Sequence, residues 1–376
     1  MVRVIITGGG TGGHVYPALA IARGLQAARP DMELLYMGTT RGLEADVVPR
    51  AGLPLVTITV RGLDRRRLWR NIPALAKTTQ GLAEAWLQVR RFRPDAVVGT
   101  GGYVSGPVCL AAALQGVPVI LHEQNAFPGV TNRLLAVLAR TVCLTFPEAA
   151  SRFPRRARLV TTGLPVRPEI LQADRETCRR ELGLQPGQLM ILVTGGSQGA
   201  RSLNQALLPL LEVLAGRPDV SLLQVTGRRD YEYYRQQIPT RGIDLDKSGN
   251  ITIKPYIYNM EQALAAADLV IGRAGASFLA EVLARGLPSI LVPYPHATAN
   301  HQEYNARALA RQGAARVILD RELKEGRLYR VVMELLGARE KLQTMAAAAA
   351  SLGRPGALEA IVQVVMAAVE HRGSPS

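Results

Sequence analysis

The sequence predicts an α/β protein made of two doubly wound domains, each with a parallel sheet covered by helices on both faces. Short apolar strands alternate with helical segments along the 376 residues, and several strands end directly at a glycine-rich loop that opens a helix. This alternation is typical of parallel sheets flanked by helices. The second half also repeats the first, since residues 116–122 (GVPVILH) and 286–292 (GLPSILV) share a Gly-x-Pro turn before an apolar strand.

The first half contains one series of strands and helices. Its first strand, residues 2–7, stops at the glycine-rich loop 8–13. A helix follows from about His14, with Pro17 in its first turn, where proline is tolerated. The other expected elements are, in chain order, a strand at 34–38, a helix near 42–50, a strand at 96–98, an apolar helix at 104–115 and a strand at 117–121.

The second half begins the pattern again. A strand at 189–194 ends at the glycine loop 195–199, a strand at 268–272 leads into a further helix, and a strand at 287–292 ends at Pro293. The join between the halves lies near Pro165. We therefore expect a first domain at 1–163, a second domain at 164–355, and a last helix at 356–370 that packs back on the first domain.

Composition and cysteine usage exclude several classes of protein. Apolar residues make up 48% and charged residues 20%, which is ordinary globular composition and excludes a disordered or collagen-like chain. We expect no transmembrane segment, since no uninterrupted apolar run approaches about 18 residues, and no signal peptide. The three cysteines are far apart and have no metal-ligand spacing, which fits a reducing cytoplasm.

The excess of basic residues is concentrated in the first half. Residues 1–165 hold 20 Lys and Arg against 9 Asp and Glu, and residues 61–93 alone hold nine against two. Such a surface favours an anionic partner: a membrane, a nucleic acid or a phosphorylated substrate. Tryptophan among arginines is typical of a membrane surface, and the residues concerned are Arg65, Arg66, Arg67, Trp69 and Arg70. Nucleic acid is the competing interpretation, but no helix-turn-helix or stacking module is evident.

The loop at 8–13 matches the Gly-x-Gly-x-x-Gly dinucleotide fingerprint, but its context does not support NAD binding. The strand at 34–38 ends without the acidic residue that would hold ribose hydroxyls, and no P-loop motif is present. The loop can still bring backbone N–H groups close to an anion or a sugar. His14 follows it at a helix N-terminus, which favours the neutral imidazole required of a general base. The alternative is a capping or packing histidine.

Further polar loops follow other strands, at the sheet edge where α/β proteins bind ligands. The glycine loop 99–107 and the cluster 122–125 belong to the first domain. In the second domain, the loop 195–201 suits a diphosphate, with Ser197 and Arg167 as additional donors. Glu281 could accept hydrogen bonds from a ribose diol, or it could simply interact with its helix N-terminus. The cluster 300–303 suits sugar hydroxyls. No plausible metal cluster is present, and we interpret Asp244 and Asp246 as part of a surface loop.

Together these motifs resemble the MurG family of peptidoglycan glycosyltransferases, glycosyltransferase family 28. The resemblance covers nearly the whole chain and rests on the segments 9–14 (GGTGGH), 101–107 (GGYVSGP), 122–125 (HEQN) and 195–201 (GGSQGAR), with Glu281 and 301–302. It implies the GT-B fold, with two Rossmann-like domains. It also implies inverting, metal-independent transfer of N-acetylglucosamine from UDP-N-acetylglucosamine to the C4 hydroxyl of N-acetylmuramic acid in lipid I, which forms lipid II. No cofactor is expected.

The resemblance also assigns roles to individual residues. His14 is the implied base, Ser197 and Arg167 meet the diphosphate, Ile257 contacts uracil, and Glu281 binds ribose. The full set of implied substrate contacts is Thr11, Gly12, Gly13, Asn125, Arg167, Ser197, Ile257, Ala276, Ser277, Phe278, Leu279, Ala280, Glu281 and Gln302. The implied location is the cytoplasmic face of the bacterial cell membrane, as a peripheral protein on an anionic surface.

Three alternatives remain open at this point. A glycosyltransferase of the same fold could use another acceptor, such as diacylglycerol. A UDP-sugar epimerase would share the architecture but would need no lipid acceptor and no membrane surface. A non-catalytic UDP-sugar binding protein is disfavoured by a histidine placed in the glycine loop.

Overall fold

The computed structural model describes residues 1–60, 72–196 and 198–373, with backbone alone for 72–77, 246 and 371–373. The chain divides into two compact units. Unit 1 comprises Met1–Pro165 and the chain from Gly356 onward, and unit 2 comprises Val166–Pro355. The division therefore falls within three residues of the join expected from the sequence, and the last helix belongs to unit 1.

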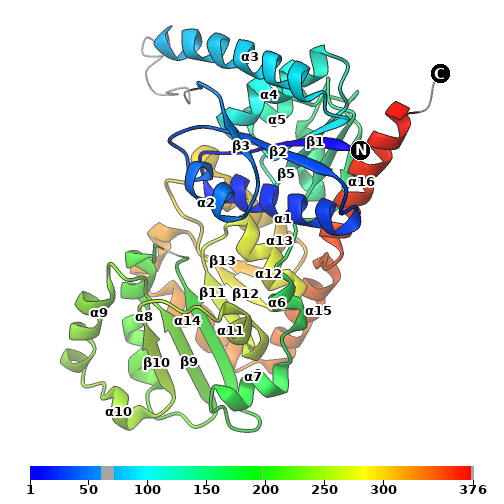
Figure 1. The fold of residues 1–376 in the computed structure, drawn as a ribbon. Coiled ribbons are helices and arrows are strands. Elements are labelled where there is room, and N and C mark those ends of the chain that lie inside the picture. The colour runs from blue at the N-terminus through cyan, green and yellow to red at the C-terminus, as the bar shows by residue number, and fades with distance from the viewer. Residues whose placement is uncertain (61–71, 197, 374–376) are drawn as a thin grey trace. The chain divides into compact units, whose positions relative to one another are not determined.

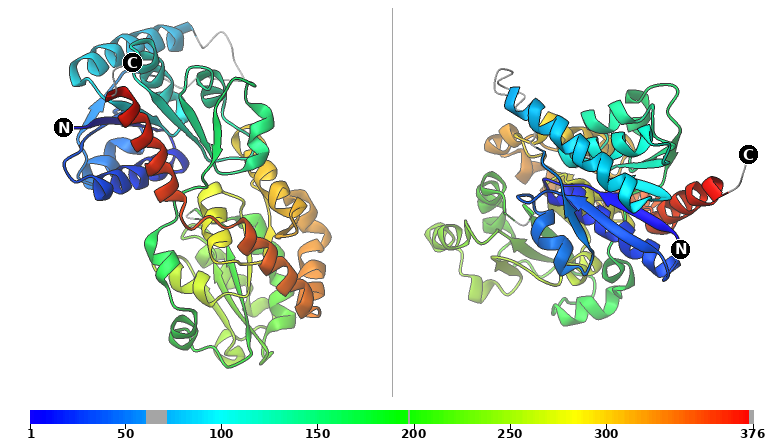
Figure 2. Two further views of the ribbon diagram at one scale, coloured as in Figure 1. Left: turned by 90° about the vertical axis from the view of Figure 1, so that its right-hand side faces the viewer. Right: turned by 45° about the horizontal axis from the view of Figure 1, so that its top comes forward.

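Unit 1 is built on a parallel sheet (Figures 1 and 2). Within its described residues, seven strands follow the order β3-β2-β1-β4-β5-β6-β7. The strands are β1 (Arg3–Thr7), β2 (Glu33–Gly38), β3 (Leu55–Thr57), β4 (Ala96–Gly99), β5 (Val119–Glu123), β6 (Thr141–Leu144) and β7 (Leu159–Thr161). The α-helices are α1 (Gly12–Ala28), α2 (Glu44–Arg50), α3 (Ile72–Phe92), α4 (Gly102–Leu114), α5 (Val130–Leu135) and α16 (Ala357–Gly373).

The central strands of unit 1 are apolar on both faces because helices cover both sides of the sheet. Val4 and Ile6 of β1 join a buried cluster with α1 and α16, whereas Ile5 between them joins a cluster with α4. Successive side chains of a strand point to opposite faces, so one continuous apolar run supplies both cores. Helix α16 packs directly against α1 (Figure 2).

Unit 2 repeats this architecture. Its described residues form a six-stranded parallel sheet in the order β10-β9-β8-β11-β12-β13. The strands are β8 (Leu189–Thr194), β9 (Val220–Val225), β10 (Ile251–Lys254), β11 (Leu269–Gly272), β12 (Ser289–Leu291) and β13 (Ala315–Val317). The α-helices are α6 (Pro168–Gln172), α7 (Arg175–Glu181), α8 (Arg201–Leu214), α9 (Tyr231–Gln237), α10 (Leu245–Ser248), α11 (Met260–Ala266), α12 (Ala276–Ala284), α13 (His301–Arg311), α14 (Arg327–Leu336) and α15 (Arg339–Leu352).

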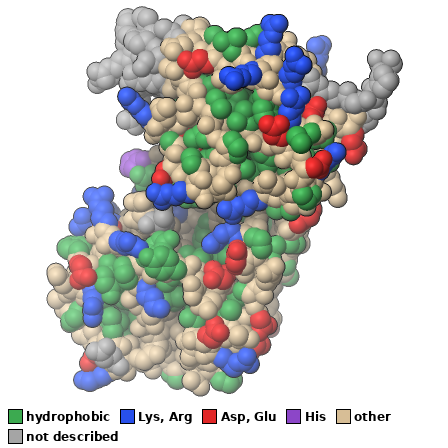
Figure 3. All heavy atoms as spheres, in the orientation of Figure 1, with side chains coloured by type: hydrophobic (Ala, Val, Ile, Leu, Met, Phe, Trp, Pro, Cys, Tyr) green, Lys and Arg blue, Asp and Glu red, His purple; other side chains and the backbone are tan. Residues whose placement is uncertain are grey.

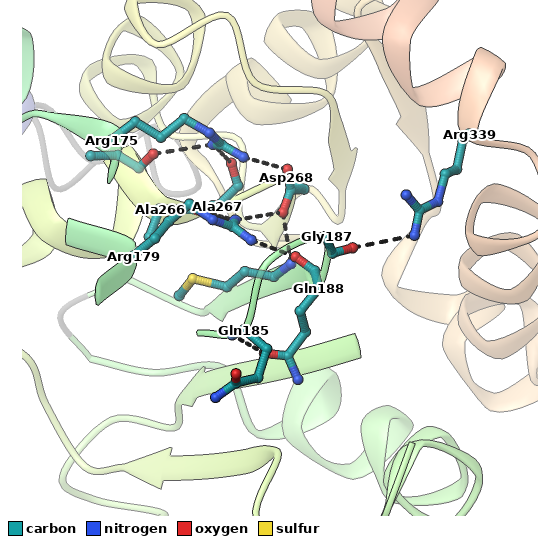
Figure 4. Close-up of polar contacts among 11 residues, drawn as sticks. Arg175, Arg179, Gln185, Gly187, Gln188, Ala266, Ala267, Asp268 and Arg339 are labelled. Carbon is teal, nitrogen blue, oxygen red and sulfur yellow. Dashed lines mark hydrogen bonds and ion pairs between the residues drawn. The ribbon is translucent and has the colours of Figure 1, made fainter. Parts of the chain in front are cut away.

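Ion pairs and hydrogen bonds join a helix to two strands at the amino-terminal edge of the unit 2 sheet (Figure 4). Asp268, just before β11, accepts hydrogen bonds from Arg175 Nη2 at 2.5 Å, Arg179 Nη1 at 3.0 Å and the Met190 backbone N–H at 2.8 Å. Arg179 also donates to the Gln188 carbonyl at 2.5 Å. This cluster ties α7 to β8 and β11 at the amino-terminal edge of the sheet.

The segment Arg339–Glu370 is long and apolar enough to cross a membrane by length and composition, which the sequence analysis did not expect. In the structure it consists of two helices, α15 and α16, separated by residues 353–356. Met345 of α15 joins the core of unit 2, and Ile361 of α16 joins the core of unit 1. The segment is therefore two helices that belong to different folded units, and one third of its most apolar 18-residue window is buried.

Candidate active site

Three loops meet at the carboxyl-terminal edge of the unit 1 sheet, after β1, β4 and β5. The Thr100 backbone N–H donates to the Thr7 carbonyl at 2.9 Å, and the Thr100 hydroxyl donates to the His14 carbonyl at 2.8 Å. Because β1 and β4 are neighbours in a parallel sheet, their carboxyl ends bring the loop 8–11 and residues 100–102 side by side.

Glycine is required where these loops approach one another. Gly102 has a φ of +84°, and a Cβ placed there would lie 2.3 Å from the Gly9 carbonyl oxygen. Gly101 has a φ of +101°, and its Cβ would lie 3.0 Å from His14 Nδ1. L-residues with side chains rarely adopt such backbone angles. These two glycines thus permit the close approach of the loops and make room for the histidine ring.

His14 lies in the first turn of α1, where the sequence predicted it, and is partly exposed. Its Nδ1 lies 3.0 Å from the Thr100 carbonyl oxygen and 3.2 Å from Gln124 Oε1. Both partners are acceptors, so Nδ1 carries the proton and Nε2 keeps its lone pair in the neutral ring. Burial lowers the pKa of His14, while the hydrogen bonds to Gln124 and Thr100 act in the opposite direction. The imidazole is therefore held neutral, with one basic nitrogen.

Two buried residues of the 122–125 cluster support this histidine. Gln124 is 1% exposed, and its amide nitrogen donates to the Thr100 carbonyl at 2.8 Å and lies 3.1 Å from His122 Nδ1. His122 Nε2 lies 2.9 Å from the Gly163 carbonyl oxygen, and burial lowers the pKa of His122 to about 4. The sequence analysis recognised the cluster but gave a role only to Asn125. Gln124 could have been identified from the sequence, because it directly follows a strand that was predicted to border the site.

The remaining predicted contacts of unit 1 lie at the same edge. Thr11 is the N-cap of α1 and makes no side-chain cap hydrogen bond, and Gly12 and Gly13 open the helix. The Asn125 backbone N–H donates to Glu123 Oε1 at 3.0 Å. Burial raises the pKa of Glu123, although hydrogen bonds from Asn125, Asn132 and Gly129 counteract part of this effect. Glu123 thus fixes the loop that presents Asn125.

In unit 2, the structure brings Arg167 and Glu281 together. Arg167 Nε donates to Glu281 Oε1 at 2.8 Å, although the two residues are 114 positions apart. The Glu281 side chain is 13% exposed and that of Arg167 is 50% exposed. Glu281 belongs to the second turn of α12, so the helix dipole alone does not account for its position. The sequence analysis expected Arg167 at a diphosphate, whereas here the guanidinium engages the carboxylate expected to bind ribose.

Gln302 forms hydrogen bonds with two loops at the carboxyl-terminal edge of the unit 2 sheet. Its Oε1 accepts hydrogen bonds from the Tyr294 backbone N–H at 2.9 Å and the Ala274 backbone N–H at 3.2 Å. Just before it, Ala299 and Asn300 both have φ angles in the left-handed region, at 52° and 55°. Non-glycine residues seldom adopt this conformation, and such strain is concentrated at functional sites.

Arg273, for which no role was expected from the sequence, stands directly after β11. Its Nη1 donates to Asp320 Oδ1 at 2.6 Å and to the Val292 carbonyl at 3.1 Å, while its Nη2 lies 3.0 Å from the Ser202 hydroxyl. The Ser202 hydroxyl also donates to Asp320. Because Arg273 follows β11 directly, this network fixes the loop that opens α12. In the sequence, an arginine directly after an apolar strand was the signal that could have identified Arg273 as a residue of the site.

Some predicted residues line the start of α12, and others lie outside the described residues. Ile257 and Phe278 both pack against the same buried cluster of unit 2. The other predicted contacts on α12 besides Phe278 and Glu281 are Ala276, Ser277, Leu279 and Ala280. The predicted residues that the structure does not describe are Ser197, Arg65, Arg66, Arg67, Trp69 and Arg70.

The two edges offer different chemistry. Unit 1 presents a neutral histidine with a free basic nitrogen beside exposed backbone at a helix N-terminus. Unit 2 presents a carboxylate, a guanidinium and the N-terminus of α12. Such groups suit proton abstraction in unit 1 and the binding of a diol and an anion in unit 2.

Comparison with known proteins shows the family of this chain. The model described as the glycosyltransferase family 28 N-terminal domain matches residues 4–144, and the one described as the C-terminal domain matches residues 190–361. The UDP-N-acetylglucosamine--N-acetylmuramyl-(pentapeptide) pyrophosphoryl-undecaprenol N-acetylglucosamine transferase of Moorella thermoacetica is 81% identical over 368 residues, covering 98% of this chain and 99% of that protein.

Solved structures give the same result for the fold. The crystal structure of Acinetobacter baumannii MurG has a TM-score of 0.81 at 32% identity and covers 98% of this chain and 100% of that one. A UDP-GlcNAc 2-epimerase from Neisseria meningitidis, at 14% identity, has a TM-score of 0.65 over 98% of this chain and 100% of its own, which is a likeness of fold alone. The predicted GT-B fold class is confirmed. The chain belongs to glycosyltransferase family 28.

Proposed function

We propose that this protein transfers N-acetylglucosamine from UDP-N-acetylglucosamine to the C4 hydroxyl of N-acetylmuramic acid in lipid I, with inversion at the anomeric carbon, to form lipid II. The observation that carries this proposal is the 81% identity, over 98% of the chain, to a protein named for transfer to the pyrophosphoryl-undecaprenol acceptor. The neutral His14 in unit 1 and the carboxylate of Glu281 in unit 2 fit the two tasks of that reaction.

His14 acts as the general base. Its Nε2 takes the proton from the C4 hydroxyl as the oxygen attacks the anomeric carbon, and the bond to the UDP oxygen breaks. A neutral imidazole accepts this proton, whereas an imidazolium cannot. The hydrogen bonds of Nδ1 to Thr100 and Gln124 support this role because they leave Nε2 as the basic atom. Thr11, Gly12, Gly13 and Asn125 contact the donor.

Unit 2 binds the donor nucleotide. Glu281 accepts hydrogen bonds from the ribose hydroxyls, Ile257 contacts uracil, and Gln302 contacts the sugar through its amide nitrogen, since its Oε1 is already engaged. Arg167, Ser197 and the N-terminus of α12 stabilise the negative charge that develops on departing UDP. We propose that these groups make a metal unnecessary.

Unit 1 also binds the membrane that holds the acceptor. Helices α3, α4 and α5 pack against one another in succession, and they expose Leu87, Leu114 and Leu134 to 65%, 59% and 70%. Arg90 and Arg91 of α3 are exposed as well. On the face drawn in Figure 3, arginine side chains and some acidic ones lie among hydrophobic side chains on unit 1. Apolar and basic groups together suit an anionic lipid surface, on the cytoplasmic face of the cell membrane.

The test is release of UDP from UDP-N-acetylglucosamine with and without a lipid I analogue, in the presence of EDTA. Release that requires the acceptor and survives EDTA is the expected result. Release without acceptor would instead indicate an epimerase or a hydrolase, and transfer to diacylglycerol in place of lipid I would reassign the acceptor. Loss of activity in EDTA would contradict the metal-independent mechanism.

The membrane proposal has a separate test. The protein is expected to co-sediment with vesicles that contain anionic lipid and to bind zwitterionic vesicles less. Replacing Leu87 and Leu134 by Ser should weaken this binding, while Val213→Ser on α8 of unit 2, where the side chain is 39% exposed, serves as the control. Equal sedimentation with both lipid compositions would overturn the proposal.

A further inference from the structure

A chain of hydrogen bonds runs from the His14 ring through two buried side chains to the backbone where unit 1 ends. It links His14 Nδ1 to Gln124 Oε1 at 3.2 Å, Gln124 Nε2 to His122 Nδ1 at 3.1 Å, and His122 Nε2 to the Gly163 carbonyl oxygen at 2.9 Å. Neither Gln124 nor His122 contacts solvent appreciably, at 1% and 0% exposure. The general-base mechanism does not by itself require either residue.

The chemistry of the partners fixes the direction of every bond in this chain. A carbonyl oxygen only accepts, so His122 Nε2 donates to Gly163 and, in the neutral ring, His122 Nδ1 accepts. Gln124 Nε2 therefore donates to His122, and it also donates to the Thr100 carbonyl at 2.8 Å. The amide can have only one orientation, with Oε1 toward His14. His14 Nδ1 is then the donor, and Nε2 carries the lone pair.

We propose that Gln124, held in place by His122, is a positioning residue that orients the His14 ring and keeps its proton on Nδ1. This inference rests on the proposed function, because Gln124 affects the reaction only through His14, the proposed base. A partner on the other ring nitrogen sets the tautomer and orientation of a functional histidine, as a carboxylate does in the serine protease triad. Here a neutral amide takes that place, which orients the ring without adding a negative charge.

Titratable groups lie on several elements around His14. They include Tyr36 on β2, Glu44, Asp46 and Arg50 on α2, Tyr103 on α4, His122 and Glu123 on β5, Arg133 on α5, Tyr16 and Arg23 on α1 itself, and Glu359 and Glu370 on α16, which packs against α1. Glu44 accepts hydrogen bonds from the Gly10 backbone N–H and the Thr39 hydroxyl, and Glu123 accepts from the loop 125–132. These carboxylates are engaged with backbone and neutral side chains. Within the part of the chain that the structure describes, the His14 ring has hydrogen bonds with the Thr100 carbonyl and Gln124.

Two substitutions of Gln124 should shift the pH dependence of kcat/KM in opposite directions. The quantity compared is the position of the acid limb, the pH range in which activity is lost as His14 becomes protonated. Gln124→Met keeps the shape and removes the acceptor, so His14 protonates less readily and the limb moves to lower pH. Gln124→Glu places a carboxylate at Nδ1, so His14 protonates more readily and the limb moves to higher pH. In Gln124→Met, kcat should fall roughly 10- to 100-fold, as when an outer partner of a functional histidine is removed, with KM for UDP-N-acetylglucosamine unchanged.

Gln224→Met is the matched control, since Gln224 is a fully buried glutamine of β9 in unit 2 that donates to Asn204. In this variant, the acid limb of the pH profile of kcat/KM should lie at the same pH as in the wild type. A purely structural role for Gln124 would lower activity without opposite shifts, and that result would overturn the inference while leaving His14 as base. Full turnover by His14→Ala would instead remove the proposed mechanism itself.

A measurement on the unmodified chain tests the inference even if a Gln124 variant fails to fold. The sequence contains only five histidines, so ¹⁵N-labelled histidine gives a tractable spectrum. The expected spectrum at neutral pH has His14 protonated on Nδ1 and His122 protonated on Nε2, with signals assigned through His14→Gln and His122→Gln. A His14 proton on Nε2 would overturn the inference.

Discussion

The carboxyl-terminal edges of the two sheets have similar architecture but different chemistry. In unit 1, a histidine, a glutamine and a second histidine are joined by hydrogen bonds between neutral groups. In unit 2, a guanidinium and a carboxylate form an ion pair beside a helix N-terminus. The repeated fold therefore places two different sets of groups at equivalent edges.

This difference indicates a division of tasks. A neutral imidazole with one free nitrogen suits proton transfer, for which a charged environment would set the wrong protonation state. A carboxylate and a guanidinium suit recognition of hydroxyl and phosphate groups, which need fixed charge rather than titration. Substitutions at each edge should therefore affect different steps of the reaction.

His14→Ala should lower kcat by about 10²- to 10⁴-fold, the usual contribution of a general base. The affinity for UDP should stay unchanged, because the substitution leaves unit 2 intact. Turnover can be followed by UDP release and binding by calorimetry. His14→Gln is a second variant that keeps a polar side chain and should be equally slow. Turnover near that of the wild type in either variant would exclude His14 as the base.

Asp268→Asn should lower the free energy of unfolding by about 2 kcal/mol, since hydrogen bonds to a charged group contribute about that much. The kcat at 25 °C should not change, because Asp268 lies at the amino-terminal edge of the sheet. Asp219→Asn is the control: Asp219 pairs with Arg217 on the surface, and its loss should change stability by less than about 0.5 kcal/mol. Equal destabilisation by both variants, in chemical denaturation, would contradict the structural role of the Asp268 cluster.

Glu281→Gln should weaken the binding of UDP about tenfold, the loss expected for one charge-assisted hydrogen bond. The sharper comparison uses 2′-deoxy-UDP, which lacks a ribose hydroxyl. The wild type should bind UDP more tightly than 2′-deoxy-UDP, whereas Glu281→Gln should discriminate less between them. An undiminished preference in the variant would show that Glu281 does not read the ribose.

In the pH dependence of kcat/KM, the acid limb should lie below pH 6.5. Burial lowers the pKa of His14 from its ordinary value of 6.5, so the imidazole stays neutral, and able to accept a proton, at lower pH than a free imidazole. As the pH falls through this lowered pKa, the base becomes protonated and activity is lost. A limb at or above pH 6.5 for the wild type would contradict the assignment.

The central strands and the loops after them could be predicted from the sequence because their signals are local. The strands at 2–7 and 189–194 are mostly apolar runs that stop at glycines, and the structure has β1 and β8 there. Several strands were not predicted, including β9 with six residues and β3 and β13 with three residues each. A strand of three residues is too short to display a hydrophobic period.

The contacts inside the sites could not be predicted in the same way. Gln124 and His14 are 110 residues apart, and Arg167 and Glu281 are 114 apart. Only the order of strands in each sheet decides that these side chains meet, and a motif read along the chain does not contain that order. The residue types were therefore visible in the sequence, whereas the partner of each residue was not.

The most direct test of the division of tasks combines His14→Ala with Glu281→Gln. Sites that share no partner contribute additively, within about 0.5 kcal/mol. The free-energy cost of the double variant, measured from kcat/KM for UDP-N-acetylglucosamine, should therefore equal the sum of the two single costs. His14→Ala should act on kcat, and Glu281→Gln on nucleotide affinity. A double variant no slower than His14→Ala alone would show that the two edges act as one unit and would contradict the account.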